Sequence, residues 1–362
     1  MRTRGVLIAR WVAVVISAAA VGGGLFYAIG LVLDWPAWLR GIGWVWRREV
    51  PEASVPRLLQ LAVVAAVWAW GVFLVVRDGS KWRPRHVRAL LIWTVLFTPV
   101  VQVVCAAQHR ALPFSAAFMT TVDPREGFFE EGVKMEDPVA FVRGHVDRMP
   151  QYRGVHLQTQ PPGWAVAFWG ARVVWERIPA AADSVAHWLL RSDCTSYEYR
   201  GMEPAQIAAA TLQMSLVVIS GVGAIPLYLL GREAFSERAA RLAVAVYPLM
   251  PGLLAFQSKR GVLYAIVTIT ALWLARRAVT RGRWRDAVSL GVLLAVTSLL
   301  ALQSSVMVAL VGAYLLGHVL FIERSRGSWR VVARISLAVA LSFAVLWGGM
   351  WLVWGVSWPE IY

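Results

Sequence analysis

The sequence predicts an all-α protein of the membrane, a polytopic bundle of about nine transmembrane helices with one large extracytoplasmic loop. Of its 362 residues, 58% are hydrophobic, and the mean hydropathy is +0.58, which is too apolar for a soluble domain of this length. Apolar runs of about 20 residues, enough to cross about 30 Å of hydrocarbon, recur along the chain. One polar interval, Gln108 to Pro161, separates the early runs from the later ones.

The apolar runs predict the individual crossings. The first run follows Arg2 and Arg4, and its length suits an uncleaved anchor better than a signal peptide. In chain order the runs are Val6–Leu33, Leu58–Val76, Ala89–Ala107, Ala205–Leu230, Ala239–Phe256, Val262–Ala275, Ala287–Leu302, Val306–Phe321 and Val331–Trp354. Pro226, Pro248 and Pro251 are expected to bend or open their helices, which neighbouring helices can accommodate in a membrane.

Basic residues orient the predicted bundle. They gather in four short segments, at residues 77–88, 232–241, 276–285 and 324–330. Under the positive-inside rule these segments and the N-terminus are cytoplasmic. Alternation then places the following segments outside: Asp34–Arg57, Gln108–Pro204, Gln257–Gly261 and the C-terminus. We therefore attribute the net charge of +15 to basic residues that orient the helices and contact anionic lipid headgroups. No nucleic-acid partner is expected.

One further helix does not fit the alternation. Residues 163–178 are apolar and aromatic, but Arg172, Glu176 and Arg177 make the segment amphipathic, and it is short for a span. We expect it to lie along the outer membrane surface. The chain is thus interpreted as one membrane domain, with N-terminal spans in 1–107, the outer loop in 108–204 and C-terminal spans in 205–362. Its lack of Asn and its 33 Arg against three Lys are typical of a GC-rich bacterial genome, so the expected location is a bacterial cytoplasmic membrane.

The outer loop holds most of the acidic side chains, 12 of the 21 in the chain. Asp123, Glu126, Glu130 and Glu131 fall within nine positions, and Asp123 precedes Pro124, a pair that favours a turn. A carboxylate in a partly desolvated cleft has a raised pKa and can act as a general base. Asp123, Glu130 and Glu131 are therefore the candidate catalytic residues. The alternative is that these acids only solvate an exposed loop.

The end of the loop predicts an anion site. Pro161 and Pro162 are well placed to begin a helix, and the free amide groups of a helix start favour a phosphate. Arg153 and His156 precede this start and can assist, although a lone His is more often structural. No Cys/His pair has zinc spacing, and no phosphate loop, HExxH or GxSxG motif is present. Few ionisable residues lie inside the runs, which argues against an ion-coupled transporter.

Two stretches resemble the GT-C superfamily of membrane glycosyltransferases, which use polyprenyl-phosphate sugars and include the protein mannosyltransferases and aminoarabinose transferases. Residues 161–169, PPGWAVAFW, resemble the start of the helix after that family's first loop. Residues 227–252 resemble its next helical hairpin, with a short cytoplasmic turn. The resemblance extends over roughly residues 89 to 320, and its motifs are short and degenerate.

The resemblance implies an activity and roles for particular residues. Asp123 occupies the position of the family's candidate catalytic base. Gln160 stands where relatives often have Lys or His against the donor phosphate, and Lys259 with Arg260 stands where they often have an Asp. These departures leave phosphate contact to Arg153, His156, Lys259, Arg260 or the helix start.

The implied reaction transfers a sugar from a polyprenyl-phosphate carrier, with inversion, to an unknown glycan, lipid or protein acceptor on the extracytoplasmic face of the bilayer. No cofactor is implied, and a divalent metal is left open. Two other interpretations also stay open. The chain can be a non-catalytic transporter or scaffold for envelope assembly, or a relative that binds a polyprenyl lipid without catalysis.

Overall fold

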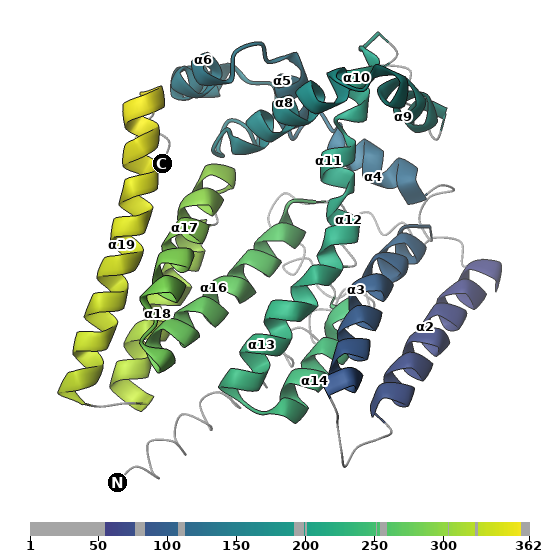
Figure 1. Ribbon diagram of the computed structural model, residues 1–362. Coiled ribbons are helices and arrows are strands. Elements are labelled where there is room, and N and C mark those ends of the chain that lie inside the picture. The colour runs from purple at the N-terminus through teal and green to yellow at the C-terminus, as the bar shows by residue number, and fades with distance from the viewer. Residues whose placement is uncertain are drawn as a thin grey trace, which may run out of the picture.

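Helices make up most of the described part of the chain, which contains no β-strand, and this confirms the all-α class (Figure 1). The computed structural model describes residues 55–76, 84–107, 113–191, 199, 201–250, 252–253, 259–302, 304–322 and 325–355. The predicted first crossing, Val6–Leu33, lies outside these residues, as does nearly all of the predicted outer segment Asp34–Arg57.

Long helices run side by side through the lower part of the view in Figure 1. Their bounds are α2 (Val55–Val76), α3 (Pro84–Ala107), α13 (Ala224–Ala234), α14 (Glu237–Val246), α16 (Gly261–Arg281), α17 (Trp284–Leu300), α18 (Ser304–Gly317) and α19 (Arg326–Trp354). A short π-helical turn, His318–Ile322, continues α18. Five segments are long and apolar enough to cross a membrane: Pro84–Cys105, Pro204–Ala234, Gly261–Arg281, Ser304–Ile322 and Gly327–Trp354. The chain is therefore an integral membrane protein by the character of its helices.

The described helices bear out five of the nine predicted crossings by length and composition. Two of the other predicted crossings are helices that are too short by this measure. Helix α17 has 17 residues, and the apolar part of α2 is limited to Ala62–Phe73. The run Ala239–Phe256 does not form one helix, because α14 ends at Val246 and a 3-10 turn, η5 (Tyr247–Leu249), follows. Pro248 explains the break, since proline inside a helix removes a hydrogen bond and clashes with the preceding turn.

The span Pro204–Ala234 is built from short pieces. They are α10 (Pro204–Ala208), α11 (Thr211–Met214), α12 (Leu216–Ile219), the 3-10 turn η4 (Ser220–Gly223) and α13. Glycine allows the chain to pass its neighbours at η4: a Cβ atom on Gly221 would overlap the Val95 carbonyl of α3, and one on Gly223 would overlap the Tyr247 hydroxyl. The Tyr247 hydroxyl donates a hydrogen bond of 2.7 Å to the Ser220 carbonyl.

Residues 113–191, predicted as the body of the outer loop, form a layer of short helices over one end of the bundle (Figure 1). They are α4 (Pro113–Thr121), α5 (Phe128–Lys134), α6 (Pro138–Arg143), α7 (His145–Arg148), the 3-10 turn η2 (Met149–Gln151), α8 (Gly163–Glu176) and α9 (Pro179–Arg191). We call the end of the bundle that they cover the cap end. Aromatic residues hold this layer together: the rings of Phe129 and Phe168 meet edge to face with centroids 5.4 Å apart, and both side chains are buried.

Helix α8 occupies nearly the whole of the segment predicted as an amphipathic helix. It packs closely on α5, because a Cβ atom on Gly132 would lie within 2.7 Å of the Phe168 Cβ atom. Arg172 reaches back to donate a hydrogen bond of 2.9 Å to the Met135 carbonyl, beyond the end of α5. The polar face of α8 is thus partly used for packing inside the cap.

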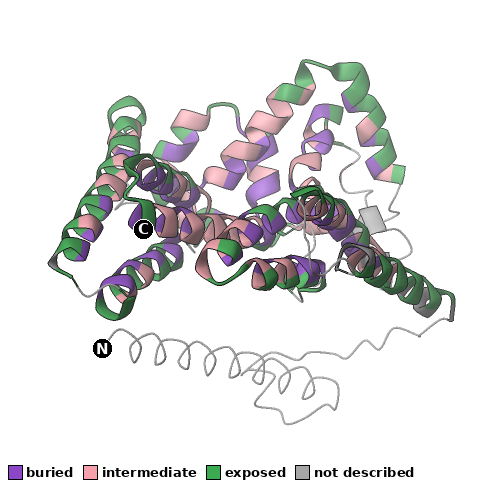
Figure 2. Cartoon of the chain, turned by 60° about the horizontal axis from the view of Figure 1, so that its bottom comes forward, coloured by how far each residue is buried: buried purple, intermediate pink, exposed green. Residues whose placement is uncertain are grey.

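Described residues of all four basic segments lie at the other end of the bundle, which we call the basic end (Figure 1). Arg281, at the end of α16, pairs with Glu233 of α13 at 2.7 Å. Arg277 pairs with Asp286 of α17 at 3.3 Å. Helix α19 starts at the same end, at Arg326 (Figure 1). Between the two ends, many large apolar side chains are exposed, for example Val345 and Leu352 on α19. Exposed residues lie along the outer faces of the helices (Figure 2). Such faces suit contact with lipid.

Candidate functional site

The polar site of the cap begins at a tight turn between α4 and α5. The turn is closed by a 2.9 Å hydrogen bond from the Glu126 amide to the Asp123 carbonyl, as expected after an Asp-Pro pair. Gly127 follows with φ of 77°, a left-handed conformation that glycine adopts without strain. Gly154 packs against Gly127 so closely that a Cβ atom there would overlap its backbone. This contact lays the segment that carries His156 beside the turn.

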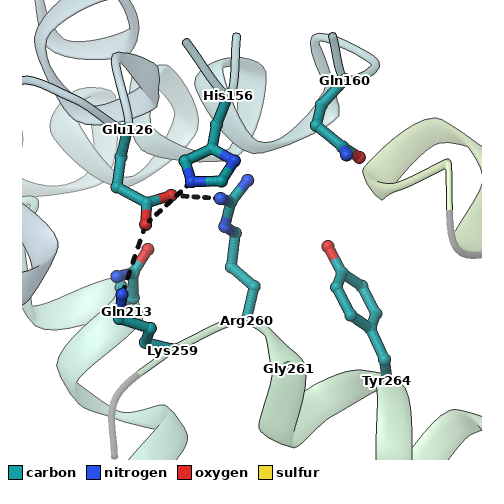
Figure 3. A pocket seen from close by; sticks show the side chains of 8 residues that line it. All are labelled: Glu126, His156, Gln160, Gln213, Lys259, Arg260, Gly261 and Tyr264. Atoms are coloured by element: carbon teal, nitrogen blue, oxygen red, sulfur yellow. Dashed lines mark hydrogen bonds and ion pairs between the residues drawn. The ribbon is translucent and has the colours of Figure 1, made fainter. Parts of the chain in front are cut away.

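A second segment, from the start of α16, completes the site. Arg260 donates to the Glu126 carboxylate, and Lys259 Nζ lies 3.7 Å from Oε1 of the same carboxylate. His156 Nε2 is 3.8 Å from Oε1 on its other side. The Arg260 guanidinium also lies 4.0 Å from the centroid of the Phe128 ring, a cation–π contact. We call Glu126, His156, Lys259 and Arg260 the cradle (Figure 3).

The members of the cradle differ in exposure. The side chains of Glu126 and Arg260 are each 13% exposed, whereas those of His156 and Lys259 are 53% and 46% exposed. The inner pair is therefore a largely desolvated ion pair, and the outer two groups remain open to an incoming ligand.

The cradle lines a hollow of about 360 Å³, together with Gln160, Gln213, Gly261 and Tyr264 (Figure 3). Gln160 is fixed by a hydrogen bond of 3.0 Å that its side-chain oxygen accepts from the Leu302 amide. The Tyr264 hydroxyl accepts from Trp164 Nε1 at 3.0 Å and donates to the Leu300 carbonyl at 3.2 Å. Gln213 is 5% exposed, and within the described part of the chain no hydrogen bond holds its carboxamide. The hollow thus offers cations and amide groups on walls that are already positioned.

Asp123 lies in an adjoining hollow of about 320 Å³, lined also by Met119, Thr120, Pro124, Arg125, Tyr199 and Lys259. Lys259 belongs to both hollows. Arg125 donates two hydrogen bonds to the Asp123 carboxylate, from Nε at 2.9 Å and from Nη2 at 2.7 Å. These hydrogen bonds from Arg125 hold the pKa of the Asp123 carboxyl below its usual value. Asp123 is thus ionised in the neutral range, contrary to the raised pKa expected of a buried loop carboxylate.

The other predicted site residues fall into two groups. His156, Gln160, Lys259 and Arg260 come together in the hollow described above. Glu130, Glu131 and Arg153 line neither hollow. Glu130 forms a local pair with Lys134 at 2.7 Å, one turn further along α5. Burial and the neighbouring Glu130 raise the pKa of Glu131.

The start of α8 does not line the hollow, although the sequence predicts an anion site there. A Cβ atom on Gly163 would overlap the Leu299 carbonyl, so this helix start is packed tightly on the end of α17. The helix start that does line the hollow is that of α16, at Gly261. Its positive dipole end adds to the attraction of Lys259 and Arg260 for an anion.

A buried histidine supports the wall that carries Gln160. His145 is fully buried, with Nε2 3.1 Å from the Gln160 carbonyl and Nδ1 3.3 Å from the Tyr152 hydroxyl. Burial lowers the pKa of His145 to about 4. The neutral ring can donate from Nε2 to the carbonyl and accept from the tyrosine at Nδ1, so both nitrogens are used.

Besides Gly261, three residues that line the hollow are not among the candidates that the sequence predicts. In the sequence, Glu126 is one of four clustered acids, and only the glycine that follows it indicates a special backbone position. Gln213 is a polar residue inside an apolar run, and this is a usable signal because such residues are rare in spans. Nothing in the sequence marks Tyr264 as a site residue, because a tyrosine near a helix start is common at a membrane interface.

Among the described residues no cluster of three or more His, Cys, Asp or Glu side chains is suited to a metal ion. Comparison with protein-family models, with curated proteins and with solved structures gave no match to this chain.

Proposed function

We propose that the chain is a membrane glycosyltransferase of the GT-C type, which transfers a sugar from a polyprenyl-phosphate carrier to an acceptor outside the cytoplasmic membrane. The observation that carries the proposal is the cradle, where Lys259 and Arg260 meet His156 beside a hollow that also has neutral amide groups from Gln160 and Gln213. Cations suit a phosphate, and amides suit the hydroxyl groups of a sugar.

The position of the cradle favours a lipid-linked donor. It lies where the cap meets the start of α16, whose 21 residues are apolar enough to span the bilayer. A phosphate held there stands at the membrane surface, and its prenyl chain can remain among the lipid-facing helices. A water-soluble nucleotide donor has no need of such a location.

In the proposed reaction the acceptor's hydroxyl oxygen bonds to the anomeric carbon of the sugar, and the bond from that carbon to the phosphate oxygen breaks. The phosphate keeps the electron pair and leaves as the polyprenyl phosphate. Asp123 takes the hydroxyl proton. Its lowered pKa makes it a weak base but keeps it ionised. A weak base suffices when the sugar is oxocarbenium-like in the transition state, because the oxygen becomes acidic as its bond to carbon forms.

The resemblance to GT-C enzymes is the source of the assigned reaction, and the acceptor is left as a glycan, lipid or protein. The test is sugar transfer by the purified full chain in detergent, with a panel of polyprenyl-phosphate hexoses and pentoses. We expect Asp123→Asn to reduce transfer by at least about a hundredfold, in the range of general-base effects. Glu130→Gln, whose side chain lines neither hollow, is the matched control. Equal transfer by the two variants would refute the role of Asp123, and no transfer from any donor would refute the function.

The orientation has its own test. In a background with Cys105→Ala and Cys194→Ala, Ser184→Cys lies on exposed α9 of the cap, and Thr280→Cys lies on α16 at the basic end. A membrane-impermeant maleimide added to intact cells should label position 184 and not position 280. The reverse pattern would place the cradle in the cytoplasm and exclude the proposal.

A further inference from the structure

The Glu126 carboxylate lies where an anionic ligand of the cradle would lie. It is approached by three side chains from two distant segments, Arg260, Lys259 and His156. Each of these can donate to an anionic oxygen, and among the described residues that line this hollow Glu126 is the only carboxylate. Two carboxylate oxygens among such donors resemble two oxygens of a phosphate.

We propose that Glu126 is a built-in competitor that occupies the phosphate position of the cradle between turnovers, and that it helps to expel the phosphorylated lipid after sugar transfer. The competition itself depends only on the geometry of the cradle. The role in product release rests on the proposed function, because that function supplies the lipid phosphate.

Charge counting shows why a competitor is useful at this site. The donor is a phosphodiester with one negative charge, whereas the product is a phosphomonoester with a charge of about −1.5 to −2 at pH 7. Lys259 and Arg260 alone would therefore hold the product more strongly than the donor. A tethered carboxylate that returns to Arg260 weakens the binding of donor and product by the same factor, and it thereby favours release of the tightly held product.

The structure gives Glu126 both a stable closed position and a way to leave it. In the closed position the carboxylate is 13% exposed and pairs with Arg260, which also stacks on Phe128. Glu126 itself ends a turn next to Gly127, while Lys259 and His156 stay about half exposed. An incoming phosphate can thus contact the Lys259 ammonium and the His156 ring first and then replace the carboxylate at Arg260.

The buried carboxamide of Gln213 is a second sign of a ligand in this hollow. It is 5% exposed, points toward the cradle in Figure 3, and has no hydrogen-bond partner in the described part of the chain. The carboxamide lines the hollow, where a ligand oxygen or hydroxyl group can pair with it. Glu126 fills the anion position, and the remainder of the hollow is left for the group that the phosphate carries.

The test is the binding of farnesyl monophosphate, a short prenyl phosphate, to the purified full chain in detergent by isothermal titration calorimetry. Glu126→Gln removes the competing charge and keeps the shape of the side chain. We expect it to bind the probe about tenfold more tightly, which corresponds to about 1.4 kcal/mol. Glu130→Gln, which also removes one negative charge from this region, should bind as the wild type does. An affinity of Glu126→Gln equal to or weaker than that of the wild type would overturn the inference.

A second variant and a second probe keep the outcome unambiguous. Glu126→Asp keeps the charge but shortens its reach, so it should bind the probe more tightly than the wild type and less tightly than Glu126→Gln. The same measurements with inorganic phosphate separate the lipid from the anion. If inorganic phosphate gains as much from Glu126→Gln and binds as tightly as farnesyl phosphate, the competition stands and the lipid donor of the proposed function falls. If sugar transfer is observed but neither Glu126 variant binds more tightly, the function stands and the competitor role falls.

Discussion

Arg260 donates to the carboxylate of Glu126 across 134 positions of sequence, and this pair joins the start of α16 to the cap. Both side chains are 13% exposed, so most of their hydration has been lost in exchange for each other. Such a pair is costly to break on one side only, because the remaining charge is left poorly solvated. The pair thus couples the integrity of the cap to the state of the proposed ligand site.

Arg260→Gln should therefore destabilise the protein in the absence of ligand. We expect a loss of about 1–3 kcal/mol, measured by thermal or chemical unfolding in detergent, since Glu126 loses its closest partner. Arg125→Gln is the comparison, because Arg125 also pairs with a carboxylate but is 84% exposed. Its loss should stay within about 1 kcal/mol. Equal losses would show that the Glu126 pair behaves as an ordinary surface ion pair.

Arg125→Ala should change the pH dependence of sugar transfer. The hydrogen bonds from Arg125 are the largest cause of the lowered pKa of Asp123, so their removal raises this pKa toward its ordinary value. Because the ionised carboxylate is the active form, the acid limb of the pH–rate profile should move to higher pH. The profile of Lys134→Ala should keep the wild-type limb, since Lys134 pairs with Glu130 instead. An unmoved acid limb in Arg125→Ala would mean that Asp123 does not control this limb.

His145 should make the cap sensitive to acid. Burial lowers its pKa to about 4, against an ordinary value of 6.5, so the folded protein keeps the ring neutral while the unfolded chain takes up a proton. Stability from this group is therefore complete above pH 6.5 and is lost progressively as the pH falls toward 4. The unfolding temperature of the wild type should fall across this window more steeply than that of His145→Gln. Parallel curves for the two proteins would exclude His145 as the cause.

Gly163→Ala should separate α8 from the end of α17. A Cβ atom at this position would overlap the backbone carbonyl of Leu299, and backbone cannot move aside cheaply. We expect a destabilisation of about 1–3 kcal/mol. Gly170→Ala, on the same helix with no atom within 4 Å of the added Cβ, should be neutral or stabilising by up to about 1 kcal/mol. A similar unfolding temperature for both variants would show that the α8–α17 contact is looser than described.

Much of the fold follows from the apolar runs, because length and hydropathy are properties of local sequence. The breaks were harder to place. Pro248 marks the end of α14, but the short pieces between Pro204 and Ala234 depend on close passage of Gly221 against Val95 of α3. That contact joins segments that are distant in the sequence, so a local sequence pattern cannot predict it. The cap is similar, since α5 and α8 pack on each other through residues that read only as a polar loop with one apolar helix.

Part of the candidate site could also be predicted from the sequence. Alternation of spans predicts that the loop after α3 and the segment before α16 share one side of the bundle, and the Arg260–Glu126 pair joins them. The sequence does not show which of the four clustered acids lies in the cradle. Glu130 and Lys134 are four residues apart, the spacing of a local helix pair, and they pair at 2.7 Å. By contrast, only tertiary packing distinguishes Glu126, in the cradle, from Asp123, in the adjoining hollow.

The lipid that copurifies with the chain tests the central claim most directly. Mass spectrometry of the full chain purified in mild detergent should detect a polyprenyl phosphate or its glycosylated form. The signal should be lost in a variant with Lys259→Ala and Arg260→Gln, and kept in Glu130→Gln at equal protein yield. If only bulk phospholipids copurify, or if the double variant retains the prenyl lipid, the cradle does not hold a lipid phosphate.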